Sequence, residues 1–151
     1  MPSGAFTSAG TTLAVAAALP ATQDAAGYAA LTWVLVGDVT DIGEFGKSYD
    51  LVTHNPLAER ATYKRKGNYN NGNLAVQMAR VPTDGGQTIL IDAVDDDDSY
   101  PFRVVLQNGT TQYFSGQVMS YTTNVGNGGQ ITAAAVSIEI DGDVVEVAPA
   151  P

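Results

Sequence analysis

Alternation of apolar and polar positions is the clearest structural signal in this chain. It is strict over residues 73–81 and returns over residues 131–141, which predicts two strands that each bury one face. The inward positions are Leu74, Val76, Met78, Val136, Ile138 and Ile140. The opposite faces carry small, neutral side chains, which suit packing between subunits: Ala75, Gln77, Ala79, Ala133, Ala135 and Ser137.

Other segments are predicted as strands because β-branched and aromatic residues gather between turn-forming residues. They are 11–16, 31–40, 47–55 and a final edge strand at 144–148. Residues 18–27 between the first two are predicted as a loop.

Residues 100–121 carry the strongest hairpin signal. Asn108-Gly109 separates two alternating runs, and this dipeptide favours a type I′ turn in which both central residues have positive φ.

The period changes after Pro82. Ile89, Leu90, Ala93 and neighbouring apolar residues predict one short helix over about 86–95, capped by Thr83 or Asp84. The run Asp95–Asp98 opposes the helix dipole and is expected to end the helix.

Together these elements predict a mainly β (α+β) fold, a two-sheet β-sandwich or flattened barrel with one flanking α-helix. A length of 151 residues indicates a single domain, 1–151. Residues 1–10 are expected to form a flexible N-terminal arm and 149–151 a short C-terminal tail.

Charge distinguishes one segment from the rest. The formal net charge is −9, yet four of the seven basic residues lie close together, at Arg60, Lys64, Arg65 and Lys66. Residues 57–72 lack apolar periodicity and are predicted as a long loop. This patch could contact the phosphate backbone of nucleic acid, but an acidic protein surface is the favoured partner because the chain itself is acidic. Asp95, Asp96, Asp97 and Asp98 supply such a surface.

Reactive groups are too sparse to predict an enzyme. His54 is the only histidine and no motif gives it a partner or a nucleophile. The chain has no cysteine, and residues 92–100 lack the spaced ligands and glycine turn of a calcium loop. No cofactor, metal or catalytic site is expected.

The order of elements resembles the major tail tube proteins of long, non-contractile-tailed bacteriophages, the group that includes the phage lambda tail tube protein. The resemblance rests on "GTTLAV" (10–15), "VGDVTDIGEFGKSYD" (36–50), the charged loop, the helix after "VPTDGGQ" (81–87) and "FRVVLQNGTTQYFSGQVMSY" (102–121). The lambda pattern also includes an appended immunoglobulin-like domain, which is not expected here.

The resemblance implies a structural virion protein of the phage tail, which forms six-membered rings stacked head to tail into a tube. It also implies that the 57–72 loop reaches the next ring, that one sheet lines the channel, and that viral DNA passes through the lumen without specific binding. The implied partners are further copies of the chain, a tape-measure protein, a tail terminator and distal tail proteins, with assembly in the host cytoplasm. Two alternatives remain: the tube of a phage-derived secretion or bacteriocin particle, and a β-sandwich binding module, for instance for carbohydrate.

Overall fold

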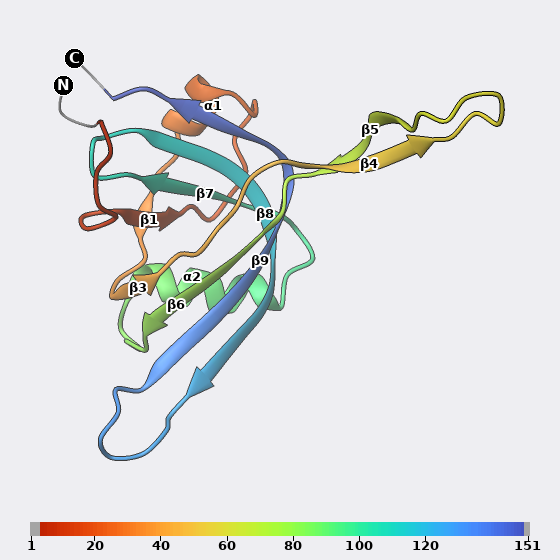
Figure 1. The fold of residues 1–151 in the computed structure, drawn as a ribbon. Helices are drawn as coiled ribbons and strands as arrows, with labels where there is room; N and C mark the ends of the chain where they lie inside the picture. Colours follow the sequence, from red (N-terminus) through yellow and green to blue (C-terminus); the bar gives the residue numbers. More distant parts are fainter. Residues whose placement is uncertain (1–3, 150–151) are drawn as a thin grey trace.

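The computed structural model describes residues 4–149, which form eleven elements (Figure 1). The first three residues of the expected arm and the last two of the expected tail lie outside this range. The strands are β1 (Thr12–Val15), β2 (Val34–Leu35), β3 (Val39–Asp41), β4 (Ser48–His54), β5 (Tyr63–Asn70), β6 (Asn73–Ala79), β7 (Tyr100–Val105), β8 (Thr111–Asn124) and β9 (Ala133–Val147). The helices are α1 (Ala25–Ala29) and α2 (Gly85–Val94).

Seven strands form one antiparallel sheet in the order β2-β1-β7-β8-β9-β6-β3. Strands β2 and β3 lie at its two opposite edges, yet only residues 36–38 separate them along the chain. Leu35 and Val39 are four steps apart along the chain, a distance of at most roughly 14 Å, so the sheet has to curl until its two edges approach each other. The prediction of a mainly β fold with a flattened-barrel character and a flanking helix is confirmed.

The core fills the inner face of the curled sheet, and α2 covers it. Leu74, Val76 and Met78 from β6 are each at most 1% exposed, as the alternation predicted. Leu90 and Ala93 of α2 join the same cluster and are fully buried. The helix spans Gly85–Val94 with Asp84 as its N-cap, which confirms the prediction for this segment.

Gln87 ties α2 to the sheet from within this core. Its side-chain amide nitrogen donates to the Gly37 and Ala79 carbonyls at 3.1 and 2.8 Å. Its amide oxygen accepts from the Val81 backbone N–H at 3.0 Å and from the Tyr121 hydroxyl at 3.1 Å. The side chain is fully buried, and these four bonds satisfy its amide, so burial carries no unpaired polar group.

Helix α1 begins within the loop expected at 18–27, extends to Ala29, and packs on the outer face of the sheet. Asp24 caps it by accepting from the Gly27 N–H at 2.7 Å. Tyr28 is 1% exposed and its ring stacks on Tyr113, with 5.3 Å between centroids. A helix of five residues presents too few apolar positions for a periodic signal, which is why the sequence pattern did not predict it.

The single strand expected at 31–40 is broken into β2 and β3. Asp38 has a φ of 55°, and it is the only non-glycine residue with positive φ within residues 4–149. A strand cannot continue through that conformation, so the chain turns there and crosses from one sheet edge to the other.

The hairpin at Asn108-Gly109 is present, but the expected type I′ turn is wrong. Only Gly109 has positive φ, at 92°, whereas Asn108 does not. The Leu106 N–H donates to the Thr110 carbonyl and the Gly109 N–H donates to the Leu106 carbonyl, at 2.8 and 2.9 Å. These bonds define a three-residue loop that ends in a left-handed glycine, the next commonest hairpin connection.

The edge strand expected at 144–148 is a continuation of β9. Strand β9 runs unbroken from Ala133 to Val147, with Gly142 at a φ of 93°, and its last residues pair with the start of β8. Glycine permits the bend that a side chain would oppose, so two predicted strands form one long element.

Neither helix within the described residues is long and apolar enough to cross a membrane.

Candidate functional site: a projecting basic hairpin

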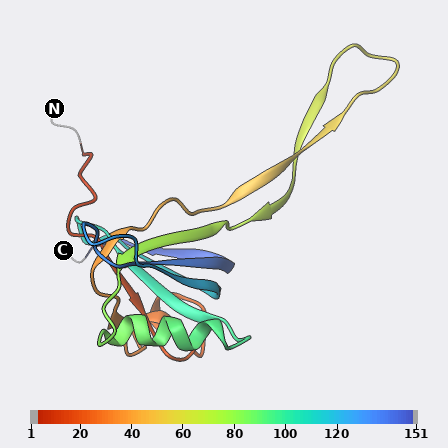
Figure 2. The same cartoon turned by 90° about the horizontal axis from the view of Figure 1, so that it is seen from below.

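Strands β4 and β5 form a second, two-stranded sheet that projects far from the body (Figures 1 and 2). Their register places Leu51 opposite Lys66, Thr53 opposite Lys64 and His54 opposite Tyr63. Every residue of both strands except Gly67 is exposed. The body of the subunit therefore covers neither face of the hairpin.

The expectation of an irregular loop over 57–72 is corrected by this arrangement. Tyr63–Asn70 is strand β5, and only residues 55–62 at the tip connect the two strands without forming an element. Alternation arises when one face of a strand is buried, and here both faces are exposed, so residues 63–70 show no strand pattern.

Aromatic and cationic side chains hold the base of the hairpin. Tyr49 and Tyr69 lie across the strands with ring centroids 5.4 Å apart. The Lys66 ammonium lies 4.9 Å from the Tyr49 centroid, and the Lys47 ammonium lies 4.4 Å from that of Tyr69. Cross-strand aromatic pairs and cation–π contacts each contribute roughly 0.5–1 kcal/mol at exposed sites, a modest support for so long a projection.

The basic side chains of β5 and of the hairpin tip have no acidic partner within residues 4–149. One ion pair occurs within residues 4–149, between Lys47 Nζ and Asp143 Oδ1 at 3.4 Å. Lys64, Arg65 and Lys66 lie on β5 and Arg60 lies in the tip, so none of the four predicted contact residues is paired. Their charge is available to another molecule.

Exposed apolar side chains also concentrate on the hairpin. Half of the twelve large exposed apolar residues of the described chain lie within residues 49–69. They are Tyr49, Leu51, Val52, Leu57, Tyr63 and Tyr69. A concentration of exposed apolar surface mixed with charge is typical of an interaction site rather than of a solvated projection.

The four aspartates form a turn directly after α2, and Asp96 organises it. Its carboxylate accepts from the Asp98 backbone N–H at 3.0 Å and from the Tyr100 hydroxyl at 2.9 Å. The bond from Asp98 first, then that from Tyr100, lowers the pKa of the Asp96 carboxyl below its ordinary value. Asp95, Asp97 and Asp98 are exposed around it.

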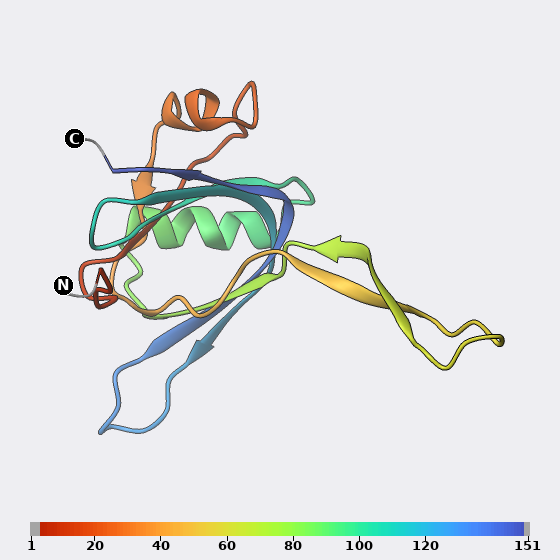
Figure 3. The same cartoon turned by 45° about the horizontal axis from the view of Figure 1, so that its top comes forward.

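The subunit does not bring the basic hairpin and this acidic turn together. Both lie toward the same end of the body, because α2 runs from the side of the chain termini toward the side from which the hairpin leaves (Figures 1 and 3). The Asp95–Asp98 pairing with the hairpin therefore stays a prediction about contacts between copies.

The outer face of β6, β9 and part of β8 is left uncovered by either helix. Cross-strand rows join Ala75 to Ser137 and Gln77 to Ala135, and β8 extends these rows with Ser120 and Thr122. Ala75, Gln77 and Ala135 are exposed, whereas Ala79, Ala133 and Ser137 are half-buried. The β6, β8 and β9 side chains in these two rows are small and neutral, as the alternation predicted. Charged residues flank them, because Glu139 lies in the next row, opposite Asn73 and Gln117, and Asp41 of β3 lies opposite Gln77.

Reactive groups are not gathered into a site anywhere in residues 4–149. No three His, Asp or Glu side chains there are grouped to hold a metal ion. His54 lies on the exposed hairpin, opposite Tyr63. Trp33 is half-buried, with its ring nitrogen donating to the Tyr28 carbonyl at 2.9 Å and Arg103 over its ring, so it offers no open aromatic platform for carbohydrate.

Known structures share this architecture at low sequence identity. A chain in the six-fold symmetrised cryo-EM structure of the anti-feeding prophage (AFP) baseplate superposes with a TM-score of 0.74 at 10% identity, covering 97% of both chains. A chain in the extended-state sheath/tube terminator of an extracellular contractile injection system, PVC, gives 0.70 at 12% identity and covers 97% of this chain and 99% of that one. The SPP1 tail tube gives 0.67 at 13% identity, over 93% and 78%.

No curated protein matches the chain. A family model described as the lambda phage tail tube protein matches residues 21–145, which include the hairpin, α2 and nearly all of the curled sheet. The chain therefore belongs to the lambda phage tail tube protein family, and it is a structural component of a virion tail rather than an enzyme.

Proposed function

We propose that six copies of this chain form a ring, that rings stack head to tail into the tail tube, and that the β4–β5 hairpin joins one ring to the next. The observation that carries the proposal is the exposed hairpin with its unpaired cations and uncovered apolar side chains. A subunit that projects such an element gains stability when another copy covers it. The six-fold symmetry of the AFP baseplate supports the ring number.

A head-to-tail contact between different surfaces builds an open filament rather than a closed dimer. In this proposal Arg60, Lys64, Arg65 and Lys66 lie at the contact, and an acidic surface of the next copy receives them. Asp95–Asp98 is one candidate for that surface. The tape-measure, terminator and distal tail proteins would bound the tube during its assembly in the host cytoplasm.

The uncovered face of β6, β8 and β9 is proposed to line the channel or to pack between neighbours in a ring. Six copies carry 6 × (−9) = −54 formal charges per ring. A nearly neutral wall in a ring that is negative overall does not attract DNA, so in this proposal the genome passes without specific binding. The small side chains on this face fit a smooth wall.

A second candidate is the inner tube of a phage-derived contractile injection particle. The AFP and PVC chains cover nearly the whole of this chain at TM-scores of 0.70 and above, which favours this candidate over the binding module. The two candidates share the stacking mechanism and differ in what passes through the lumen.

The hairpin charge is tested by replacing Lys64, Arg65 and Lys66 with Gln together. Each exposed ionic contact contributes roughly 0.2–1 kcal/mol. Losing three of them should therefore raise the protein concentration needed for tube formation about 3- to 100-fold. Sedimentation of the polymer against total protein measures that concentration.

The matched control exchanges Lys64→Arg, Arg65→Lys and Lys66→Arg, which keeps the charge, and it should assemble nearly as the unmodified chain does. Equal assembly by the Gln variant, with an unchanged circular dichroism spectrum, would remove the hairpin charge from the stacking contact.

A further inference from the structure

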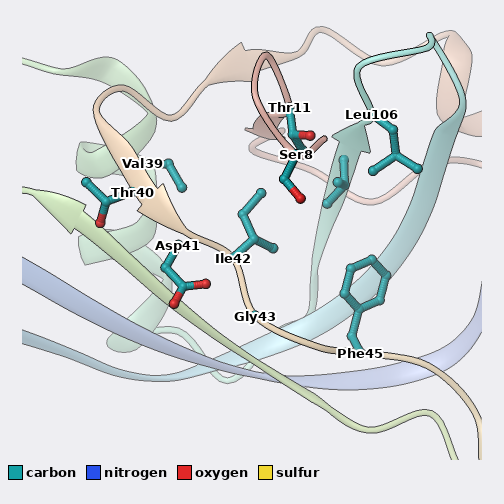
Figure 4. Close-up of a pocket in the computed structure, with 10 residues that line it drawn as sticks. Ser8, Thr11, Val39, Thr40, Asp41, Ile42, Gly43, Phe45 and Leu106 are labelled. Carbon is teal, nitrogen blue, oxygen red and sulfur yellow. The ribbon is translucent and has the colours of Figure 1, made fainter. Parts of the chain in front are cut away.

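A cavity of about 280 Å³ opens where the two edges of the curled sheet approach each other. Residues 39–45 form one wall, and the N-terminal segment with the end of β7 forms the other (Figure 4). Ile42 and Phe45 face Leu106 across it, and Val39 and Val104 complete the apolar lining. The hydroxyls of Ser8 and Thr11 and the carboxylate of Asp41 lie at its margin.

The cavity holds an unused polar atom as well as apolar surface. Thr11 Oγ1 is buried in the wall and has no hydrogen-bond partner among residues 4–149. Buried hydroxyls are normally paired, so this one is an unsatisfied polar group beside the cavity.

Residues 36–46, which include the wall at 39–45, carry three acidic residues and no basic one, and Asp41 is the one of the three that lines the cavity. Asp38, Asp41 and Glu44 are all exposed, and no ion pair reaches them within the described chain. The field at the mouth of the cavity is therefore negative, the sign that complements the hairpin.

The cavity and the hairpin lie at opposite ends of the subunit. Strand β3, the N-terminal segment and the end of β7 all lie toward the side of the chain termini, whereas the hairpin leaves the other side (Figures 1, 2 and 3). Head-to-tail stacking requires complementary surfaces placed in this way. The acidic turn at Asp95–Asp98 lies on the hairpin side and lacks this placement.

The hairpin tip matches the cavity in chemistry. Leu57 is fully exposed, at 104%, and Pro56 and Ala58 flank it. Arg60 follows three residues later and has no acidic partner in the described part of the chain. The tip thus offers the apolar side chain of Leu57 beside a cation, and the cavity offers an apolar lining beside a carboxylate.

We propose that the cavity beside β3 is the receptor for the hairpin tip of the next copy, with Leu57 entering between Ile42 and Leu106 and Arg60 pairing with Asp41. This inference rests on the proposed stacking of rings and names the surface that receives the hairpin. The occupant is a second copy of this chain, because the apolar hairpin tip, the cavity and their opposite charges all belong to one sequence.

Disulfide trapping tests this contact, because the chain has no cysteine of its own. Ser8→Cys places a thiol at the exposed margin of the cavity, and Ala58→Cys places one beside Leu57 while Leu57 itself stays. A disulfide forms only when the two Cα atoms come within roughly 7 Å. Assembled tubes of the double variant should oxidise to a ladder of trimers and longer chains on a non-reducing gel, since each copy links at both ends.

Each single variant is a control that can give dimers at most. The competing receptor is tested by Ala58→Cys with Asp97→Cys. A ladder from that pair, or tubes in which the Ser8 and Ala58 pair gives no ladder, would overturn the cavity as receptor while leaving the stacking intact. If the unmodified chain forms no tubes at all, the proposed function fails, and the inference fails with it.

A second experiment tests the proposed pair of Asp41 and Arg60 without introducing cysteine. Asp41→Lys should raise the concentration for tube formation at least about threefold, and adding Arg60→Glu should restore most of the loss, since the pair is then reversed. Asp97→Lys should change it less than twofold. The opposite ranking would assign the contact to the acidic turn.

Discussion

At the scale of single residues, Gln87 is a buried polar residue that ties α2 to the sheet. It is fully buried, and its amide makes four hydrogen bonds that join α2 to the loop at Gly37, the end of β6 and Tyr121. Nothing in the sequence marked this residue, because a glutamine in a short helix is normally exposed. Its role depends on the curl of the sheet, which brings all four partners to one place.

Gln87→Leu should lower the free energy of unfolding by about 2–4 kcal/mol, because the substitution leaves several buried polar groups unpaired. Urea denaturation of the unassembled subunit measures the change. Gln77→Leu is the matched control, since Gln77 is exposed on β6, and it should change stability by less than about 0.5 kcal/mol. Equal effects of the two substitutions would contradict this assignment.

At the scale of elements, α2 packs unusually close to the segment that links β2 and β3. A Cβ on Gly86 would lie 2.4 Å from the Leu35 carbonyl oxygen and 2.7 Å from the Val36 Cα. Both of these neighbours are backbone atoms, which cannot rotate away as a side chain can. The helix therefore requires glycine at this position.

Gly86→Ala should destabilise the subunit by about 1–3 kcal/mol through this overlap. Gly85→Ala is the adjacent control: its Cβ would lie 3.3 Å from a movable Val34 methyl group, and the gain in helix propensity offsets that contact. Thermal melts of both variants give the comparison, and a Gly86 variant as stable as the Gly85 variant would show that the helix can shift outward.

The hairpin has a second consequence at this scale. A two-stranded ribbon exposed on both faces is marginally stable in water. In the unassembled subunit, the amides of β4 and β5 should exchange with deuterium at least about 100-fold faster than those paired between β8 and β9.

Assembly should then slow exchange along the hairpin, because a second copy covers it. Hydrogen exchange followed by mass spectrometry resolves the two segments in the same sample, so β8 and β9 serve as the internal reference. Hairpin amides that stay unprotected in tubes would show that the hairpin remains free after assembly.

The sequence predicted elements well where one face is buried. Strand β6, helix α2 and the inward positions of β9 follow from periodicity alone, because Leu74, Leu90 and Ile138 all face one core. It failed where burial on one side does not shape the pattern. Strand β5 has no buried face, the break at Asp38 depends on one backbone angle, and β9 continues through Gly142.

The candidate site was predicted only in part, for a related reason. The cluster of Arg60, Lys64, Arg65 and Lys66 is visible as composition, and so is the acidity of Asp95–Asp98. Which acidic segment faces which end of the subunit is a property of the folded chain. The acidic wall at Asp38, Asp41 and Glu44 could have been noticed as a run without basic residues, but its cavity forms only when the sheet edges meet.

At the scale of the whole molecule, the subunit has two unlike ends. One projects a basic hairpin with an apolar tip, and the other holds an acidic, apolar cavity. Unlike ends on one chain favour a linear stack over a closed pair. The small, nearly neutral outer face of β6, β8 and β9 lies between these ends and is available for contacts within a ring or for the channel wall.

Negative-stain electron microscopy of the purified chain at rising concentration tests this account most directly. We predict hollow tubes built from six-fold rings at high protein concentration, and a loss of tubes, with rings or single subunits remaining, when Lys64, Arg65 and Lys66 are replaced with Gln. A single subunit at every concentration and salt level would contradict the account.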